Sequence, residues 1–196
     1  MMKTKLFILM ICFFSIVSCT KGQNVDYKQD IRKSLTAFIE NIKSKRIENA
    51  VNFIYPKYLN QVTKEHVIDM LNMAYNNPAF MVDISNFKID DIEKPEKIND
   101  EYFSIANYSF KMKFQVQWSL IPNAEIAKQK INLALKAKYG KDNIQYFDKE
   151  DYYLINAKMK ACAISQDEKD WKFLILDEKY KEELVNILPE KIFQKF

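Results

Sequence analysis

The sequence contains little glycine, histidine or cysteine, and each shortage excludes a class of functional site. Its 196 residues include two glycines, one histidine and three cysteines. A phosphate-binding loop needs several closely spaced glycines, whereas Gly22 and Gly140 are far apart. Zinc and iron–sulfur sites need clustered cysteine and histidine ligands. We therefore expect no metal site and no cofactor.

Long hydrophobic runs are also missing. The longest uncharged apolar stretch, LFILMICFFSIV, covers only residues 6–17. A membrane-spanning helix needs roughly 20 apolar residues, so this stretch is too short to cross a bilayer. It follows Lys3 and Lys5 and precedes the small residue Ser18. This pattern predicts a secretory signal peptide over residues 1–18.

The four residues at 16–19, Ile-Val-Ser-Cys, resemble the bacterial lipobox. The resemblance implies that residues 1–18 are removed and that Cys19 carries the lipid, with residues 19–25 as a tether. Several acyl chains anchor a protein stably, so the first expected partner is a lipid bilayer. Because residues 20–22 contain no acidic side chain, the segment resembles those of proteins sorted to the outer membrane, facing the periplasm. The alternative is an ordinary signal peptide and a soluble periplasmic protein.

Charge of one sign is not in excess either. Removal of residues 1–18 takes away Lys3 and Lys5 and lowers the formal charge from +4 to +2. A nucleic-acid-binding protein usually carries a strongly basic tract, so we expect no nucleic acid partner. Of the cysteines, Cys162 alone would remain beside Cys19, which leaves no pair for an intramolecular disulfide and predicts an inert, at most half-buried thiol.

The first half of the remaining chain has the period of helices. A helix is predicted from Asp26, and a stripe of apolar residues marks its buried side: Ile31, Leu35, Phe38, Ile39 and Ile42. A short helix is expected over residues 47–54. A third helix, over residues 64–75, begins after the N-cap residue Thr63 and is expected to bury Val67, Ile68, Leu71 and Ala74.

The period then changes to that of strands, which predicts a sheet. Strands are expected over residues 80–92, 101–119, 152–165 and 171–176, with a turn at residues 93–100 and a bend of the long strand near residues 107–109. In FKMKFQVQW (residues 110–118) apolar and polar residues alternate without exception. These side chains could meet core, ligand or lipid, and the first helix is expected to cover them.

Two further helices complete the pattern. One is predicted over residues 124–139, between strands, with Ile126, Ala127, Ile131, Ala134 and Leu135 facing inward and Gly140 ending it. The other covers residues 178–188 and precedes a basic, aromatic tail. Helices followed by long antiparallel strands predict a single α+β domain over residues 26–196.

Several short motifs resemble those of uncharacterised bacterial lipoproteins with a nuclear transport factor 2-like (cystatin-like) domain. They are YPKYL at residues 55–59, NP at 77–78, SNFKI at 85–89 and WKFL at 171–174. The resemblance implies N-terminal helices packed on a bent antiparallel sheet that forms a cone, often with a cavity. The helix at residues 124–139 departs from the minimal pattern of this superfamily, and we expect it to lie over one edge of the sheet.

No residue stands out as catalytic. His66 is expected in a solvated first turn of a helix, and Asp83 is expected to point to solvent. Tyrosines and a tryptophan are the candidates for lining a pocket in the cone, with core packing as the alternative: Tyr102, Tyr108, Trp118 and Tyr153.

These expectations favour a membrane-anchored lipoprotein of the bacterial cell envelope with a non-catalytic binding or scaffolding domain. Its partner would be an envelope protein or a small apolar ligand. Two alternatives stay open. One is an isomerase- or dehydratase-like enzyme that uses a cone pocket, and the other is an immunity or inhibitor lipoprotein directed against a secreted toxin.

Overall fold

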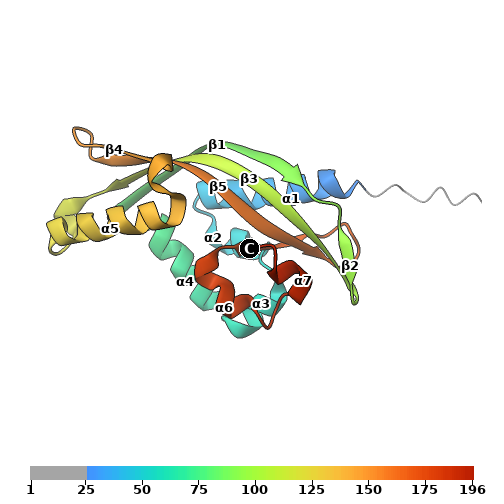
Figure 1. Ribbon diagram of the computed structural model, residues 1–196. Coiled ribbons are helices and arrows are strands. Elements are labelled where there is room, and N and C mark those ends of the chain that lie inside the picture. The colour runs from blue at the N-terminus through green and yellow to red at the C-terminus, as the bar shows by residue number, and fades with distance from the viewer. Residues whose placement is uncertain (1–25) are drawn as a thin grey trace, which may run out of the picture.

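A computed structural model describes residues 26–196. The predicted signal peptide, the tether and Cys19 lie outside the described residues. The fold is α+β, with helices packed on a bent antiparallel sheet of six strands in a cone-like arrangement (Figure 1). The helices are α1 (Tyr27–Lys43), α2 (Ile47–Val51), α3 (Pro56–Gln61), α4 (Lys64–Tyr75), α5 (Ala124–Tyr139), α6 (Lys181–Leu184) and α7 (Glu190–Phe193). The strands are β1 (Phe80–Ile92), β2 (Glu96–Ile98), β3 (Glu101–Val116), β4 (Ile144–Phe147), β5 (Tyr152–Ser165) and β6 (Lys172–Leu176).

Two long strands, β3 and β5, form the spine of the sheet. They pair without a register break from Tyr102–Ser165 to Gln115–Tyr152. Strands β1 and β2 flank β3, whereas β4 and β6 flank β5. The bend expected near residues 107–109 of β3 is found instead in the neighbouring strand β1. The register of β1 against β3 shifts between Ser85 and Lys88 and again between Ile89 and Asp91. Such bulges increase the local twist of a strand and help to bend the sheet.

The first helix matches its prediction. Its five stripe residues are all buried, and the side chain of Asp26 accepts a hydrogen bond from the Gln29 amide at the N-cap. In α4, Thr63 caps the helix as expected. Of the residues predicted to be buried in α4, Val67 is buried and Ala74 is exposed.

The inner face of the sheet, which bears Tyr108 and Met112, is covered by two different helices. Helix α1 packs near Ile84, Ala106 and Tyr108. The side chains of Met112, Phe114 and Trp118 instead form a cluster with Ile131 and Leu135 of α5. The expectation that α1 covers the whole stretch of residues 110–118 is therefore wrong, since α1 spans only the other half of the strands.

The outer face of the sheet is covered at one end only. Beside β2 and β6, Phe103, Ile105 and Cys162 pack against Leu184 and Ile192 of α6 and α7. The thiol of Cys162 is fully buried, which corrects the expectation of at most half burial. Near α5, by contrast, the outer face carries the exposed Lys111 and Lys113.

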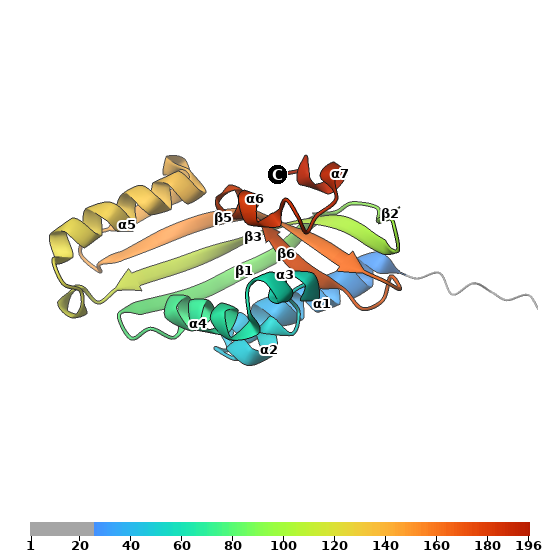
Figure 2. The same ribbon diagram turned by 90° about the horizontal axis from the view of Figure 1, so that it is seen from below.

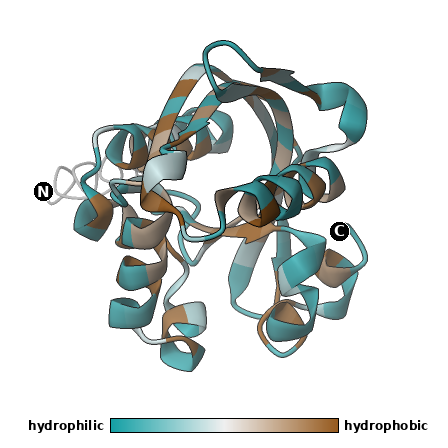
Figure 3. Ribbon diagram, turned by 90° about the vertical axis from the view of Figure 1, so that its left-hand side faces the viewer, coloured by the Kyte–Doolittle hydropathy of each residue, from teal (hydrophilic) through white to brown (hydrophobic). Residues whose placement is uncertain are grey.

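The two ends of the sheet therefore differ. We call the part around β2 and β6, where both faces are covered, the closed end, and the part around β4 and α5 the open end. Figures 1 and 2 show β2 and α5 at opposite ends of the strands. Figure 3, which faces the α5 end, shows apolar and polar residues alternating along the arched strands.

Several segments differ from their sequence predictions. The segment expected to be a turn at residues 93–100 contains β2, and β4 was not predicted. The helix expected over residues 178–188 is a 3₁₀ turn (Glu178–Tyr180) followed by the short α6. The expected tail contains α7, because Ile192 is buried against the outer face. No helix within residues 26–196 is long and apolar enough to cross a membrane.

Candidate functional site

The main candidate site is an apolar hollow of about 570 Å³ under the inner face of the sheet, which we call the cone hollow. Helices α1 and α4 form one wall, β1, β3, β5 and β6 form the roof, and the last turn of α5 and residues 177–180 line the far side. Its volume lies in the usual range for small-molecule pockets, which are mostly apolar with a few polar groups. The apolar lining includes Phe38, Ile42, Met70, Leu71, Met73, Phe80, Ile84, Phe110 and Met159.

The hollow exists because α1 and α5 cover different halves of one face. Helix α5 touches the open end through Ile131, Leu135 and Tyr139, and it buries no residue completely. Ile126 and Ala134, which were predicted to face inward, are exposed. Helix α5 therefore rests on the edge of the sheet, and the space between α1 and α5 is left unfilled.

Four tyrosines line the hollow and supply polar groups to it: Tyr75, Tyr108, Tyr139 and Tyr180. Burial raises the pKa of Tyr75, Tyr108 and Tyr139 above the ordinary value of a phenol. Their hydroxyl groups therefore stay protonated at neutral pH. They are suited to hydrogen bonding with a ligand and not to removing a proton from one.

An ion pair lies at the rim of the hollow. Lys138 Nζ of α5 is 3.0 Å from Asp177 Oδ2, which follows β6. The other carboxylate oxygen of Asp177 accepts a hydrogen bond from the Lys179 amide at 3.0 Å. Burial alone would raise the pKa of Asp177, but the Lys179 amide and Lys138 outweigh burial and lower that pKa. Burial opposes the charge of Lys138, whereas Tyr139 and Asp177 together raise the pKa of Lys138. Both groups are therefore charged at neutral pH.

The four residues predicted to line a pocket are not brought together. Tyr108 lies in the lining of the cone hollow. Tyr153 is buried beneath α5, with its ring 4.6 Å from that of Tyr146. Tyr102 lies at the closed end, where Lys97 stands 5.4 Å over its ring.

The fourth residue, Trp118, belongs to a polar cluster that ties α5 to the end of the sheet. Its indole nitrogen donates a hydrogen bond to Asp151 Oδ1 at 2.8 Å, and the Tyr146 hydroxyl donates to the same oxygen. Lys128 of α5 stands 4.6 Å over the Tyr146 ring. Asp151 Oδ1 thus accepts hydrogen bonds from both Trp118 and Tyr146, and Lys128 joins α5 to the same cluster. These contacts stabilise the open end.

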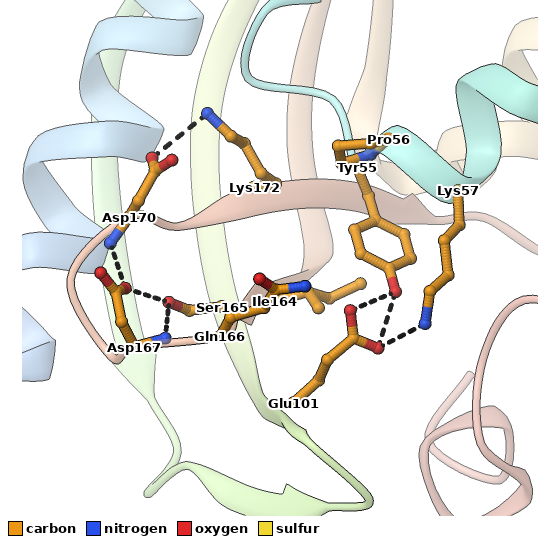
Figure 4. A pocket seen from close by; sticks show the side chains of 10 residues that line it. All are labelled: Tyr55, Pro56, Lys57, Glu101, Ile164, Ser165, Gln166, Asp167, Asp170 and Lys172. Carbon is orange, nitrogen blue, oxygen red and sulfur yellow. Dashed lines mark hydrogen bonds and ion pairs between the residues drawn. The ribbon is translucent and has the colours of Figure 1, made fainter.

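A second depression, the polar groove, lies at the closed end and has a volume of about 350 Å³ (Figure 4). The Tyr55 hydroxyl lies 2.8 Å from both oxygens of Glu101 and donates to that carboxylate, and Lys57 Nζ is 2.7 Å from Glu101 Oε2. Burial, together with the bond to Glu101, raises the pKa of Tyr55 to about 12. The bond to Glu101 raises the pKa of Lys57 to about 12.

The remaining charges of the polar groove are also paired. Asp167 accepts hydrogen bonds from the amides of Lys169 and Asp170, and Lys172 pairs with Asp170 at 3.2 Å. Partners within the chain satisfy these groups. Glu101 holds the α2–α3 connection to β3, and Asp167 and Asp170 make hydrogen bonds and an ion pair within the β5–β6 turn.

Other residues weighed from the sequence lie outside both depressions. His66 is exposed in the first turn of α4, and Asp83 is exposed on β1, as predicted. Within residues 26–196 no group of three or more histidine, cysteine or acidic side chains is arranged to hold a metal ion.

Sequence reasoning missed Lys138, Tyr139 and Asp177 at the rim. The available signal was spacing, because Lys138 and Tyr139 follow Ile131 and Leu135 on the same side of α5. Asp177 gave a weaker signal, as an acidic residue directly after an apolar strand. Their meeting depends on the fold, which brings the end of α5 to the end of β6. In the comparisons with known proteins, no protein-family model matches the chain and no curated protein is similar to it in sequence.

Proposed function

We propose that this chain is a lipid-anchored protein of the bacterial cell envelope whose cone-shaped domain binds a small apolar ligand without catalysis. The observation that carries the binding role is the open, apolar cone hollow of about 570 Å³. The proposed site of lipid attachment is Cys19, the last residue of the lipobox-like stretch at residues 16–19. The resemblance to nuclear transport factor 2-like lipoproteins supports the same assignment.

The lining is suited to adaptable apolar binding. Three methionines, Met70, Met73 and Met159, contribute to it. Methionine side chains are flexible and polarizable and are frequent at surfaces that accept varied apolar partners. Met73 is largely exposed at the rim, where an incoming ligand would meet it first.

The charges at the rim argue against the enzymatic alternative. An isomerase or dehydratase that used Asp177 as its general base would work best with a carboxyl pKa raised towards the operating pH. The carboxyl group of Asp177 is held by Lys138 and the Lys179 amide, and its pKa is lowered. A carboxylate stabilised in this way is a weak base, which supports binding as the role of the hollow.

A neutral photoreactive probe tests the binding role. The full chain is isolated from bacterial membranes, placed in phosphatidylcholine nanodiscs and irradiated with a diazirine-bearing dodecanol. We expect labelled peptides from β3, β5 and α4 that line the cone hollow. Met159→Trp should fill the hollow and abolish this labelling, whereas Met81→Trp, at an exposed position of β1, should keep it. Equal labelling of both variants would reject the hollow as the binding site.

The anchor has its own test. Cys19→Ala should abolish incorporation of a fatty-acid analogue and release the chain from membranes, while Cys12→Ala should leave both unchanged. A Cys19→Ala variant that stays labelled and membrane-bound would refute the anchor and leave the binding role open.

A further inference from the structure

A second depression adjoins the cone hollow on the other side of the Lys138–Asp177 pair. This basic hollow has a volume of about 530 Å³ and lies between the end of α5, β5 and the segment after β6. Lys138, Met159, Asp177 and Lys179 line both hollows. The two spaces therefore meet at the ion pair, with Met159 as the shared apolar contact.

The two hollows differ in chemistry. Apart from the ion pair, Lys179 and four tyrosines, the cone hollow is lined by apolar side chains. The basic hollow is lined by four lysines, Lys138, Lys158, Lys160 and Lys179, by the side-chain carboxylates of Asp177 and Glu178, and by five apolar residues, among them Leu176 and Phe196. A site with an apolar chamber beside a basic one is complementary to an amphiphile with an acidic head group.

Building on the proposed function, we propose that the ligand is a single-chain amphiphile whose apolar chain lies in the cone hollow and whose acidic head group binds Lys138 and Lys179. A lysine ammonium has three donors. Asp177 engages the Lys138 ammonium through one carboxylate oxygen, which leaves donors of that ammonium for the head group. The Lys179 amide stays bound to Asp177, so the Lys179 side chain is available without disturbing the turn.

The geometry also gives a reason for the position of the ion pair. Hydrogen bonds to ionised groups are stronger than neutral ones, and more so where water is partly excluded. Asp177 holds the Lys138 ammonium at the junction of the two hollows, where a chain in the cone hollow would place its head. The ion pair thus positions the Lys138 ammonium that binds the head group.

The test compares three competitors with the same twelve-carbon chain and different heads. Dodecanoate, dodecanol and dodecyltrimethylammonium each compete with the diazirine-bearing dodecanol on the full chain in phosphatidylcholine nanodiscs. We expect dodecanoate to compete at a concentration about tenfold lower than dodecanol, a difference of about 1.4 kcal/mol. The cationic amphiphile should be the weakest. The preference for dodecanoate should fall as salt is added, because the groups lie near the surface.

Variants assign the preference to its residues. Lys138→Met and, separately, Lys179→Met should reduce the advantage of dodecanoate over dodecanol. Each competition is measured relative to that variant's own labelling by the neutral probe, because both lysines also line the cone hollow. Lys130→Met is the matched control, because Lys130 is an exposed lysine of α5 outside both hollows. It should keep the full advantage.

The outcomes separate this inference from the proposed function. Labelling with equal competition by dodecanoate and dodecanol would overturn the acidic head group and keep the cone hollow as a binding site. If the cationic amphiphile competes most strongly, the acidic head group is also ruled out, and Asp177 and Glu178 are assigned as the residues that bind a cationic head group. Absence of labelling by the neutral probe would reject the proposed function itself.

Discussion

The closed and open ends of the sheet are made from the same two strands, yet they are packed in opposite ways. At the closed end, Ile105 and Cys162 of β3 and β5 are buried on the outer face and Ala106 and Ala161 on the inner face. At the open end the outer face is exposed to solvent. Helix α5 covers the inner face there, but none of its own residues is completely buried. The difference indicates that the closed end contributes most to the stability of the fold, and the proposed ligand site is assigned to the less tightly packed open end.

The largest expected effect contrasts the two tryptophans of the chain. Trp171 is fully buried at the closed end, and its indole nitrogen donates to the Glu168 carbonyl at 3.0 Å. Trp171→Ala should lower the free energy of unfolding by about 3–5 kcal/mol. Trp118→Ala, at the partly buried open-end site, should cost about 1–2 kcal/mol. Urea unfolding followed by circular dichroism measures both, and equal losses would abolish the distinction between the ends.

The buried thiol of Cys162 gives the next effect. Cys162→Ser places a hydroxyl group among apolar side chains and should destabilise the protein by about 2 kcal/mol, and Cys162→Ala should cost about 1 kcal/mol. Burial raises the pKa of the Cys162 thiol, so a thiol reagent at pH 8 should react only after unfolding. Rapid reaction of the folded protein at this residue would show that the closed end opens readily.

A smaller effect depends on pH and concerns the rim of the open end. The pKa of Asp177 is lowered in the folded protein, so its charge contributes stability above the ordinary carboxyl pKa near 4, and this contribution is lost as the pH falls through the lowered value. Asp177→Asn keeps an oxygen that accepts the Lys179 amide but removes the charge, so it should cost up to about 1 kcal/mol at pH 7. The difference from the wild type should shrink below pH 4. A constant difference between pH 7 and pH 3 would mean that the ion pair contributes nothing.

The smallest effects compare the two sides of α5. Leu133 is 68% exposed, and Leu133→Ala should change stability by no more than about 0.5 kcal/mol. Leu135 packs on the open end, and Leu135→Ala should cost about 1–2 kcal/mol. Thermal unfolding of the pair measures the contrast, and a reversed order would mean that the outward side of α5 is covered in solution.

The sequence was sufficient where one period or one residue type decides the structure. The stripe from Ile31 to Ile42 fixed the buried side of α1, and Gly140 ends α5 with a positive φ of 83°, which favours glycine. Alternation along residues 110–116 correctly separated the two faces of β3. Periodicity is a local signal, and each of these features is local.

The sequence was insufficient where two distant segments share one surface. Alternation showed that Met112 and Phe114 face inward, but it could not show that α5 and not α1 lies over them. The hollow depends on how far apart α1 and α5 rest, and the rim depends on Lys138 meeting Asp177. Short segments such as β4 and α7 carry too few residues for a period, so they were missed as well.

Methionine methyl groups allow the most direct test of the division between a closed end and an open, binding end. Met70, Met73 and Met159 line the cone hollow, whereas Met81 is exposed on β1 outside that lining. The full chain, labelled with ¹³C at its methionine methyl groups and held in nanodiscs, is titrated with dodecanol and followed by NMR. We expect saturable shifts of the Met70, Met73 and Met159 signals and no shift of the Met81 signal. If none of the three lining methionines shifts, the open end does not bind the probe.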